Sequence, residues 1–144
     1  MGSSAEAILC FGFVIKDEDG VAQEGPPDWL GDDIDFDDFV AKIKGLEEPT
    51  ENYKRESKAW MEYHKQRQNI VEELGVELVM YGYLDDCSHI LAVAESMKQG
   101  GWEVLELGQE IKVLPEWRDK LKEFCKLAGI EFQEPQFILC SYYG

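Results

Sequence analysis

The sequence predicts an α+β fold, a mostly antiparallel sheet of about five strands with two or three helices packed on one side. Runs rich in β-branched and aromatic residues are interspersed with stretches that have the period of an amphipathic helix. Most of the links between these runs are short, which favours antiparallel neighbours, and no βαβ unit repeats. The chain has 144 residues, the size of one ordinary domain, so residues 1–144 are expected to form a single domain.

The first element is expected at Ala5 to Ile15, an apolar run in which neither face is polar, as in a strand covered on both sides. Gly12 within this run indicates that another backbone or a ring approaches closely. Residues 16–31 are polar and contain Gly and Pro turn residues, which predicts a loop. Trp29 and Leu30 are expected to attach this loop to the body of the protein.

Two helices are expected next. Apolar side chains with the i, i+3, i+4, i+7 spacing of an amphipathic helix are Phe36, Phe39, Val40 and Ile43. Asp33 or Asp35 would be the N-cap of this helix, and Gly45 would end it. The second helix is expected from Glu51 to Leu74, where turn residues are few, and its first half carries the main basic patch of the chain.

The remaining elements complete the predicted sheet. Val76 to Tyr83 and His89 to Ala94 are apolar runs joined by a short polar loop, which predicts an antiparallel pair. Trp102 to Leu107 alternates imperfectly and is expected to be the outer strand of a three-strand meander. Pro115 begins a third amphipathic helix that ends at Gly129. Gln136 to Tyr143 is apolar or aromatic on both faces and is expected to be a central strand.

Charge is the strongest signal in the sequence. The chain carries 30 Asp plus Glu and 14 Lys plus Arg, a net charge of −16. Ten of these acids lie between Asp17 and Asp38 with no Lys or Arg among them, and we call this range the acidic segment. A chain with this charge repels nucleic acid and anionic membranes and attracts basic proteins or cations. We therefore expect no direct binding to DNA, RNA or membrane.

The acidic segment suggests a function. A face of closely spaced carboxylates can imitate a phosphate backbone and occupy the groove of a basic nucleic-acid-binding protein. We therefore predict a non-catalytic protein, without a cofactor, that binds and inhibits such a partner. The proposed anchors are Trp29, as an apolar contact if it is exposed, and Asp32, Asp33, Asp35, Asp37 and Asp38. The competing interpretation is a solvated face that keeps a small protein soluble.

The same carboxylates would also suit a calcium site. Asp17 with Asp19 and Gly20, or the three aspartates within 33–37, supply alternating oxygen ligands. Neither run has the complete calcium-binding loop with its central glycine and closing glutamate. No metal site is therefore predicted.

A Cys/His enzyme is a less favoured hypothesis. The sequence Asp85-Asp86-Cys87-Ser88-His89 brings a thiol, an imidazole and carboxylates together in one short loop. A nucleophilic cysteine activated by histidine needs contact between the two side chains. Strand geometry would send both along one face rather than toward a substrate, so a hairpin turn is the preferred interpretation.

A protein that binds or sequesters a small ligand, such as a nucleotide signal, is a further hypothesis. The aromatic residues that could line its pocket are Tyr81, Tyr83, Trp102, Tyr142 and Tyr143. Tyrosines in strands more often pack in the core and at its rim. The net charge disfavours an anionic ligand unless the basic residues of the second helix converge on the pocket, namely Lys54, Arg55, Lys58, Lys65 and Arg67.

The cysteines and the first apolar run indicate the cellular compartment in which the protein is expected. Cys10, Cys87, Cys125 and Cys140 show no CxxC spacing, and three of them lie in apolar runs, where a thiol behaves as a small hydrophobe. Reduced cysteines in a cytosolic protein are therefore expected. The apolar run Ala7 to Ile15 is too short to span a membrane and has no basic leader, so we expect no signal peptide.

Four features of the chain occur together: the early apolar strand with its acidic, Trp-containing loop, the charged helix ENYKRESKAWMEYHKQRQNIVEELGVEL, the sequence YLDDCSHILAVAES and the closing strand FILCSYYG. In these features the chain resembles a family of small uncharacterised proteins encoded by bacteriophages and prophages. The resemblance spans most of the chain and implies no site residues. It implies a context, the cytoplasm of an infected bacterium, and an accessory role such as inhibition of host defence nucleases, CRISPR complexes included.

Overall fold

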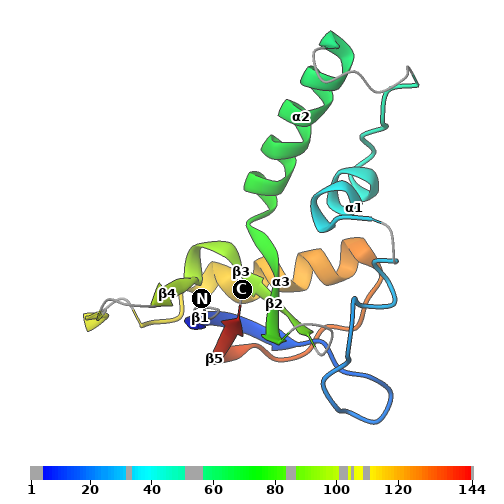
Figure 1. Ribbon diagram of the computed structural model, residues 1–144. Helices are drawn as coiled ribbons and strands as arrows, with labels where there is room; N and C mark the ends of the chain where they lie inside the picture. The colour runs from blue at the N-terminus through cyan, green and yellow to red at the C-terminus, as the bar shows by residue number, and fades with distance from the viewer. Residues whose placement is uncertain are drawn as a thin grey trace.

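The computed structural model describes residues 5–31, 34–50, 57–83, 87–100, 104, 106–108 and 111–143 (Figure 1). Its elements in chain order are β1 (Ala5–Val14), α1 (Phe36–Ile43), α2 (Lys58–Leu74), β2 (Val76–Tyr83), β3 (Ser88–Val93), the short 3₁₀ helix η2 (Ala94–Ser96), β4 (Lys98–Gly100), α3 (Pro115–Ala128) and β5 (Gln136–Tyr143). The five strands form one mostly antiparallel sheet, which confirms the α+β class.

Strand β1 is the centre of the sheet. One of its edges pairs antiparallel with β5 along residues 5–12, and its other edge pairs with β4 at 7–9 and with β3 at 12–14. Strands β2 and β3 form an antiparallel pair, and the C-terminal ends of β2 and β5 pair parallel at Gly82 and Tyr83. Because β3 pairs with both β1 and β2, the strands β1, β3, β2 and β5 close into a ring.

The closed ring has its own apolar interior. Buried side chains from three strands meet there, namely Ile8 and Cys10 from β1, Val79 from β2, and Ile90 and Ala92 from β3, and Ile138 and Cys140 of β5 pack against them. Since this cluster draws on all four strands and on no helix, it fills the space that the ring encloses. Burial in this interior, together with the nearby thiol of Cys140, raises the pKa of Cys10 to about 12.

Helices α1 and α3 cover the outer face of the ring. Val40 of α1 and Leu121 and Phe124 of α3 are fully buried against strand residues that include Phe11 and Leu91. Helix α3 lies along the sheet, whereas α2 rises away from the body and leans on α1 (Figure 1). The prediction of helices on one side of the sheet is therefore confirmed.

Gly12 shows why a glycine stands in the middle of β1. It pairs with Ala92 on one side and with Gln136 on the other. A Cβ atom built on Gly12 would lie 2.0 Å from the carbonyl oxygen of Leu91. The close backbone approach predicted from the sequence therefore occurs where β3 meets β1 and the ring closes.

The predicted three-strand meander is wrong in its third strand. The residues of Trp102 to Leu107 that the structure describes, 104, 106 and 107, are not in a strand, and the others lie outside the described residues. Strand β4 comes earlier, at Lys98–Gly100, and pairs with β1 rather than with β3. The cause is η2, where the Ser96 hydroxyl accepts the Phe11 amide N–H at 2.9 Å and donates to the Val93 carbonyl at 2.6 Å, so the chain turns back onto β1.

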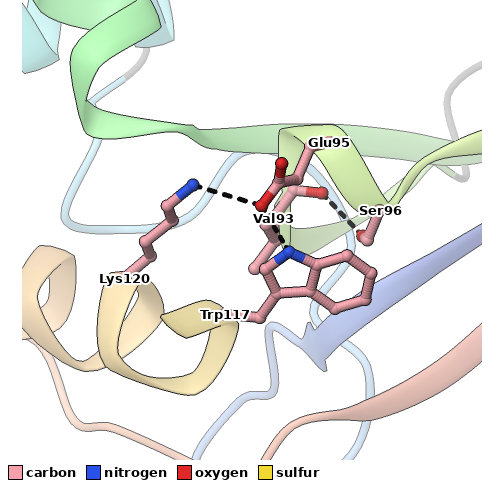
Figure 2. Close-up of polar contacts among 5 residues, drawn as sticks. All are labelled: Val93, Glu95, Ser96, Trp117 and Lys120. Carbon is pink, nitrogen blue, oxygen red and sulfur yellow. Dashed lines mark hydrogen bonds and ion pairs between the residues drawn. The ribbon is translucent and has the colours of Figure 1, made fainter. Parts of the chain in front are cut away.

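A polar contact joins η2 to α3 (Figure 2). The Trp117 indole N–H donates to Glu95 Oε1 at 2.5 Å, and Lys120 Nζ donates to the same oxygen at 3.3 Å. These hydrogen bonds hold the pKa of Glu95 below its usual value, with the indole as the main cause. The contact fixes the helix on the sheet beside the core cluster that contains the Trp117 ring.

Helix ends follow the residues that the sequence indicated. Asp35 is the N-cap of α1, and the left-handed Gly129 ends α3, which has Pro115 in its first turn. Helix α2 begins at Lys58, and residues 51–56 of the predicted second helix lie outside the described residues.

Candidate functional site

The acidic segment consists of the loop after β1 and the first turn of α1. The loop is attached to the sheet, because the Gly25 amide N–H donates to the Cys87 carbonyl at 2.9 Å and the Gln23 N–H donates to the Ile15 carbonyl at 3.0 Å. His89 Nδ1 also lies 3.1 Å from the Gly25 carbonyl oxygen. The loop is therefore held against the start of β3.

Two acids of the loop stabilise its own turns. Asp17 Oδ1 accepts the backbone N–H groups of Asp19 and Val21 at 2.9 and 3.1 Å. Asp28 Oδ1 accepts the side-chain amide of Gln23 at 3.0 Å. These contacts give Asp17 and Asp28 a structural role that explains their presence without a partner.

Asp38, one of the predicted anchors, joins two helices. Its Oδ1 accepts the Tyr63 hydroxyl at 3.1 Å and the Arg67 guanidinium at 2.7 Å, both from α2. The carboxylate and the guanidinium are each about a quarter exposed. Burial is the main cause that raises the pKa of Tyr63 to about 12, and the hydrogen bond to Asp38 and the charge of Glu48 add to it. The Asp38 carboxylate is therefore already bound by Tyr63 and Arg67 of the protein itself.

Trp29, the predicted apolar anchor, is half-buried and packs inside the protein. Its ring centroid lies 5.2 Å from that of Phe39, 5.9 Å from that of Phe124 and 6.5 Å from that of Phe36. The ring thus attaches the loop to α1 and α3, as the sequence predicted for Trp29 with the buried Leu30. The condition for a partner contact, an exposed Trp29, is not met.

The exposed carboxylates of the acidic segment are a smaller set than the sequence suggested. They are Glu18, Asp19, Glu24, Asp35 and Asp37, next to the Asp17 and Asp28 side chains already bound. Within the described ranges, none of these five carboxylates has an ion-pair partner. The predicted anchors Asp32 and Asp33 lie outside the described residues.

A cleft of about 460 Å³ lies between α1, the turn after it and α2. Ile34, Leu46 and Tyr63 contribute to its lining, with Lys42 at the end of α1. The carboxylates of Asp38, Glu47 and Glu48 also line it. Sequence reasoning missed this cleft, because only the packing of α2 on α1 brings Tyr63 beside residues 42–48.

Comparison of the chain with protein-family models, with curated proteins and with solved structures gave no match. The site is therefore interpreted from its own chemistry.

His89, the histidine of the candidate Cys87 and His89 pair, makes contacts that support the fold. His89 is half-buried, burial lowers its pKa, and its Nδ1 lies against the Gly25 carbonyl. Its backbone carbonyl accepts the Ile15 N–H at 2.9 Å. His89 therefore connects the acidic loop to β3, whereas residues 84–86 of the predicted turn lie outside the described residues.

The structure was compared with the possible calcium site. Among the described residues there is no group of three or more His, Cys, Asp or Glu side chains placed to hold a metal ion.

The aromatic residues of the possible ligand pocket are described only in part. Tyr81 packs against the ring interior, whereas Trp102 and the side chains of Tyr83, Tyr142 and Tyr143 lie outside what the structure describes. No helix in the described ranges is long and apolar enough to cross a membrane.

Proposed function

We propose that this protein is a non-catalytic inhibitor that binds a basic nucleic-acid-binding protein through the exposed carboxylates of its acidic segment. The observation that carries the proposal is the set of five exposed acids without ion-pair partners among the described residues, Glu18, Asp19, Glu24, Asp35 and Asp37. Glu18, Asp19 and Glu24 lie on a loop whose backbone is hydrogen-bonded to residues next to β1 and β3, and Asp35 and Asp37 lie at the N-cap and in the first turn of α1.

The negative charge of these carboxylates favours a partner with a basic groove. Uncompensated carboxylates at the surface attract a cationic surface and speed the encounter, and salt weakens this attraction. Acids that are already bound, such as Asp17, Asp28 and Asp38, contribute less to such a contact. The proposal therefore assigns the contact to Asp35 and Asp37, from the anchors that the sequence predicted, and extends it to Glu18, Asp19 and Glu24.

The resemblance to phage and prophage proteins gives the proposal its setting. In that setting the protein acts in the cytoplasm of an infected bacterium, and the basic partner is a host defence protein such as a nuclease or a CRISPR complex. A nucleotide-binding role is the weaker candidate, because the described residues that line the cleft of about 460 Å³ include three carboxylates and one lysine.

The test is capture from bacterial lysate on the immobilised protein, at low and at high salt, followed by elution with duplex DNA. We expect the protein to retain a nucleic-acid-binding protein that both high salt and duplex DNA release. The variant E18Q/D19N/D35N/D37N should lose this capture, because it removes four of the exposed carboxylates.

A matched variant separates the acidic segment from total charge. E72Q/E73Q/E106Q/E123Q removes four exposed carboxylates outside the segment and should retain the partner. Equal loss with both variants, or capture that duplex DNA does not compete, would refute the proposal.

A further inference from the structure

The cleft between α1 and α2 is lined by apolar side chains and by carboxylates. Ile34 and Leu46 contribute aliphatic surface, while the adjacent Glu47 and Glu48 are both exposed. The cavity measures about 460 Å³, within the range of sites that enclose a small organic group. It lies next to the exposed carboxylates of α1 but is lined by a different set of side chains.

One carboxylate of the lining is already bound by other groups of the protein. Asp38 is bound by the Arg67 guanidinium at 2.7 Å and by the Tyr63 hydroxyl at 3.1 Å, so its charge is compensated. Of the other charged side chains that the structure describes in the lining, the two carboxylates of Glu47 and Glu48 outnumber the ammonium group of Lys42. The described lining therefore carries an excess of negative charge next to the Asp38 contact.

The apolar and charged side chains of the lining determine which chemical group can bind in the cleft. An anion would be repelled by the two glutamates, and a purely apolar group would remove their carboxylates from water without replacing those hydrogen bonds. A long side chain with an aliphatic stem and a cationic head satisfies both parts of the lining. A guanidinium has the further advantage of a planar fork that binds carboxylates through two parallel hydrogen bonds.

We propose that the cleft receives one arginine side chain of the basic partner, with the stem against Ile34 and Leu46 and the guanidinium at Glu47 and Glu48. The inference rests on the proposed function and deepens it, because it names the group of the partner that is recognised. The acidic segment then supplies long-range attraction, and the cleft supplies a specific contact.

The test uses the full chain and N-acetyl-arginine-N′-methylamide, an isolated arginine side chain, titrated into the ¹⁵N-labelled protein. We expect saturable shifts confined to the amides of residues 45–48 and of α1 around Lys42. E47Q/E48Q should weaken this binding at least about threefold, since each exposed charge pair contributes modestly. K42Q should strengthen it, because it removes a cationic side chain from the lining.

The control is E72Q/E73Q, an adjacent pair of exposed glutamates near the end of α2 and outside the cleft lining. It removes the same charge as E47Q/E48Q and should leave the titration unchanged. Equal weakening by both pairs, or shifts spread over residues 17–37 instead of the cleft, would overturn the inference. A lysine analogue or spermidine that binds as tightly as the arginine probe would overturn the assignment to arginine.

Capture from lysate separates this inference from the proposed function. A partner retained equally by the wild-type protein and by E47Q/E48Q refutes the arginine contact alone. Saturable arginine shifts in a protein that captures no basic partner refute the proposed function alone and leave a cation-binding cleft.

Discussion

Gly12 is the residue at which the ring of strands depends on the absence of a side chain. Replacing it with alanine places a Cβ atom 2.0 Å from the Leu91 carbonyl oxygen and 2.7 Å from Ala92 Cα, and both neighbours are backbone atoms that cannot turn away. We expect Gly12→Ala to lower the free energy of unfolding by about 3 kcal/mol, the upper range for forcing atoms into a packed site. Urea unfolding measures this change.

Gly20→Ala is the control for that substitution. Gly20 has a φ of +78° and open space around its missing Cβ, so alanine there adds only the strain of a left-handed residue. That strain costs about 1 kcal/mol. If the two variants were equally stable, β3 would not approach β1 as closely as the structure indicates.

Among the elements, α2 depends on the contact that Asp38 makes with Tyr63 and Arg67. Apart from its connection to β2, the helix packs mainly on α1, and it rises away from the sheet (Figure 1). Asp38→Ala leaves a partly buried guanidinium without its carboxylate, and we expect a loss of about 1 to 2 kcal/mol in unfolding free energy. Hydrogen exchange in α2 should accelerate more than exchange in the strands.

The adjacent acid provides the comparison for Asp38. Asp37 is exposed and has no ion-pair partner within the described ranges, so Asp37→Ala should leave exchange in α2 close to that of the wild-type protein. Equal effects of the two substitutions would mean that the contact with Arg67 does not hold the helix.

The joint between η2 and α3 should respond to acid (Figure 2). Because the folded pKa of Glu95 lies below its unfolded value, its contacts stabilise the protein at pH values above the unfolded pKa. That contribution is lost as the pH falls through the folded pKa. Unfolding followed by tryptophan fluorescence should therefore show a steeper loss of stability below about pH 5 in the wild-type protein than in Glu95→Gln.

Trp117→Phe tests the same joint from the other side. It removes the indole donor, the main cause of the lowered pKa of Glu95, and should also reduce the acid sensitivity. An unchanged pH profile in both variants would show that Glu95 does not titrate with folding.

For the whole molecule, the net charge of −16 sets the response to salt. Repulsion among the surface acids destabilises the compact state, and salt screens it. We expect Tm to rise as ionic strength increases from about 0.01 M to about 0.15 M, over which the Debye length falls from about 30 Å to about 8 Å. Scanning calorimetry measures the rise, which should be smaller in the two variants that each lack four carboxylates.

The class of the fold and most of its elements could be predicted from the sequence alone. The apolar run before the acidic loop forms β1, as predicted. Phe36, Phe39 and Val40, whose spacing predicted an amphipathic helix, lie on the face of α1 that packs against the core. Gly12, Pro115 and Gly129 also have the local roles expected of them. These features were readable because period, capping and turn chemistry depend on residues within a few positions of one another.

Packing between distant segments determined which groups remain for a partner. The sequence predicted Asp35, Asp37 and Asp38 as equivalent anchors, whereas packing places the Asp38 carboxylate against the Arg67 guanidinium. The condition set for Trp29, an exposed ring, depended on packing as well, and the ring is partly buried. Packing between distant segments also pairs β4 with β1, and the pairing of β3 with β1 closes the strands into a ring. The cleft at Glu47 and Glu48 arises in the same way, because contacts between segments distant in sequence leave no local pattern from which they could be predicted.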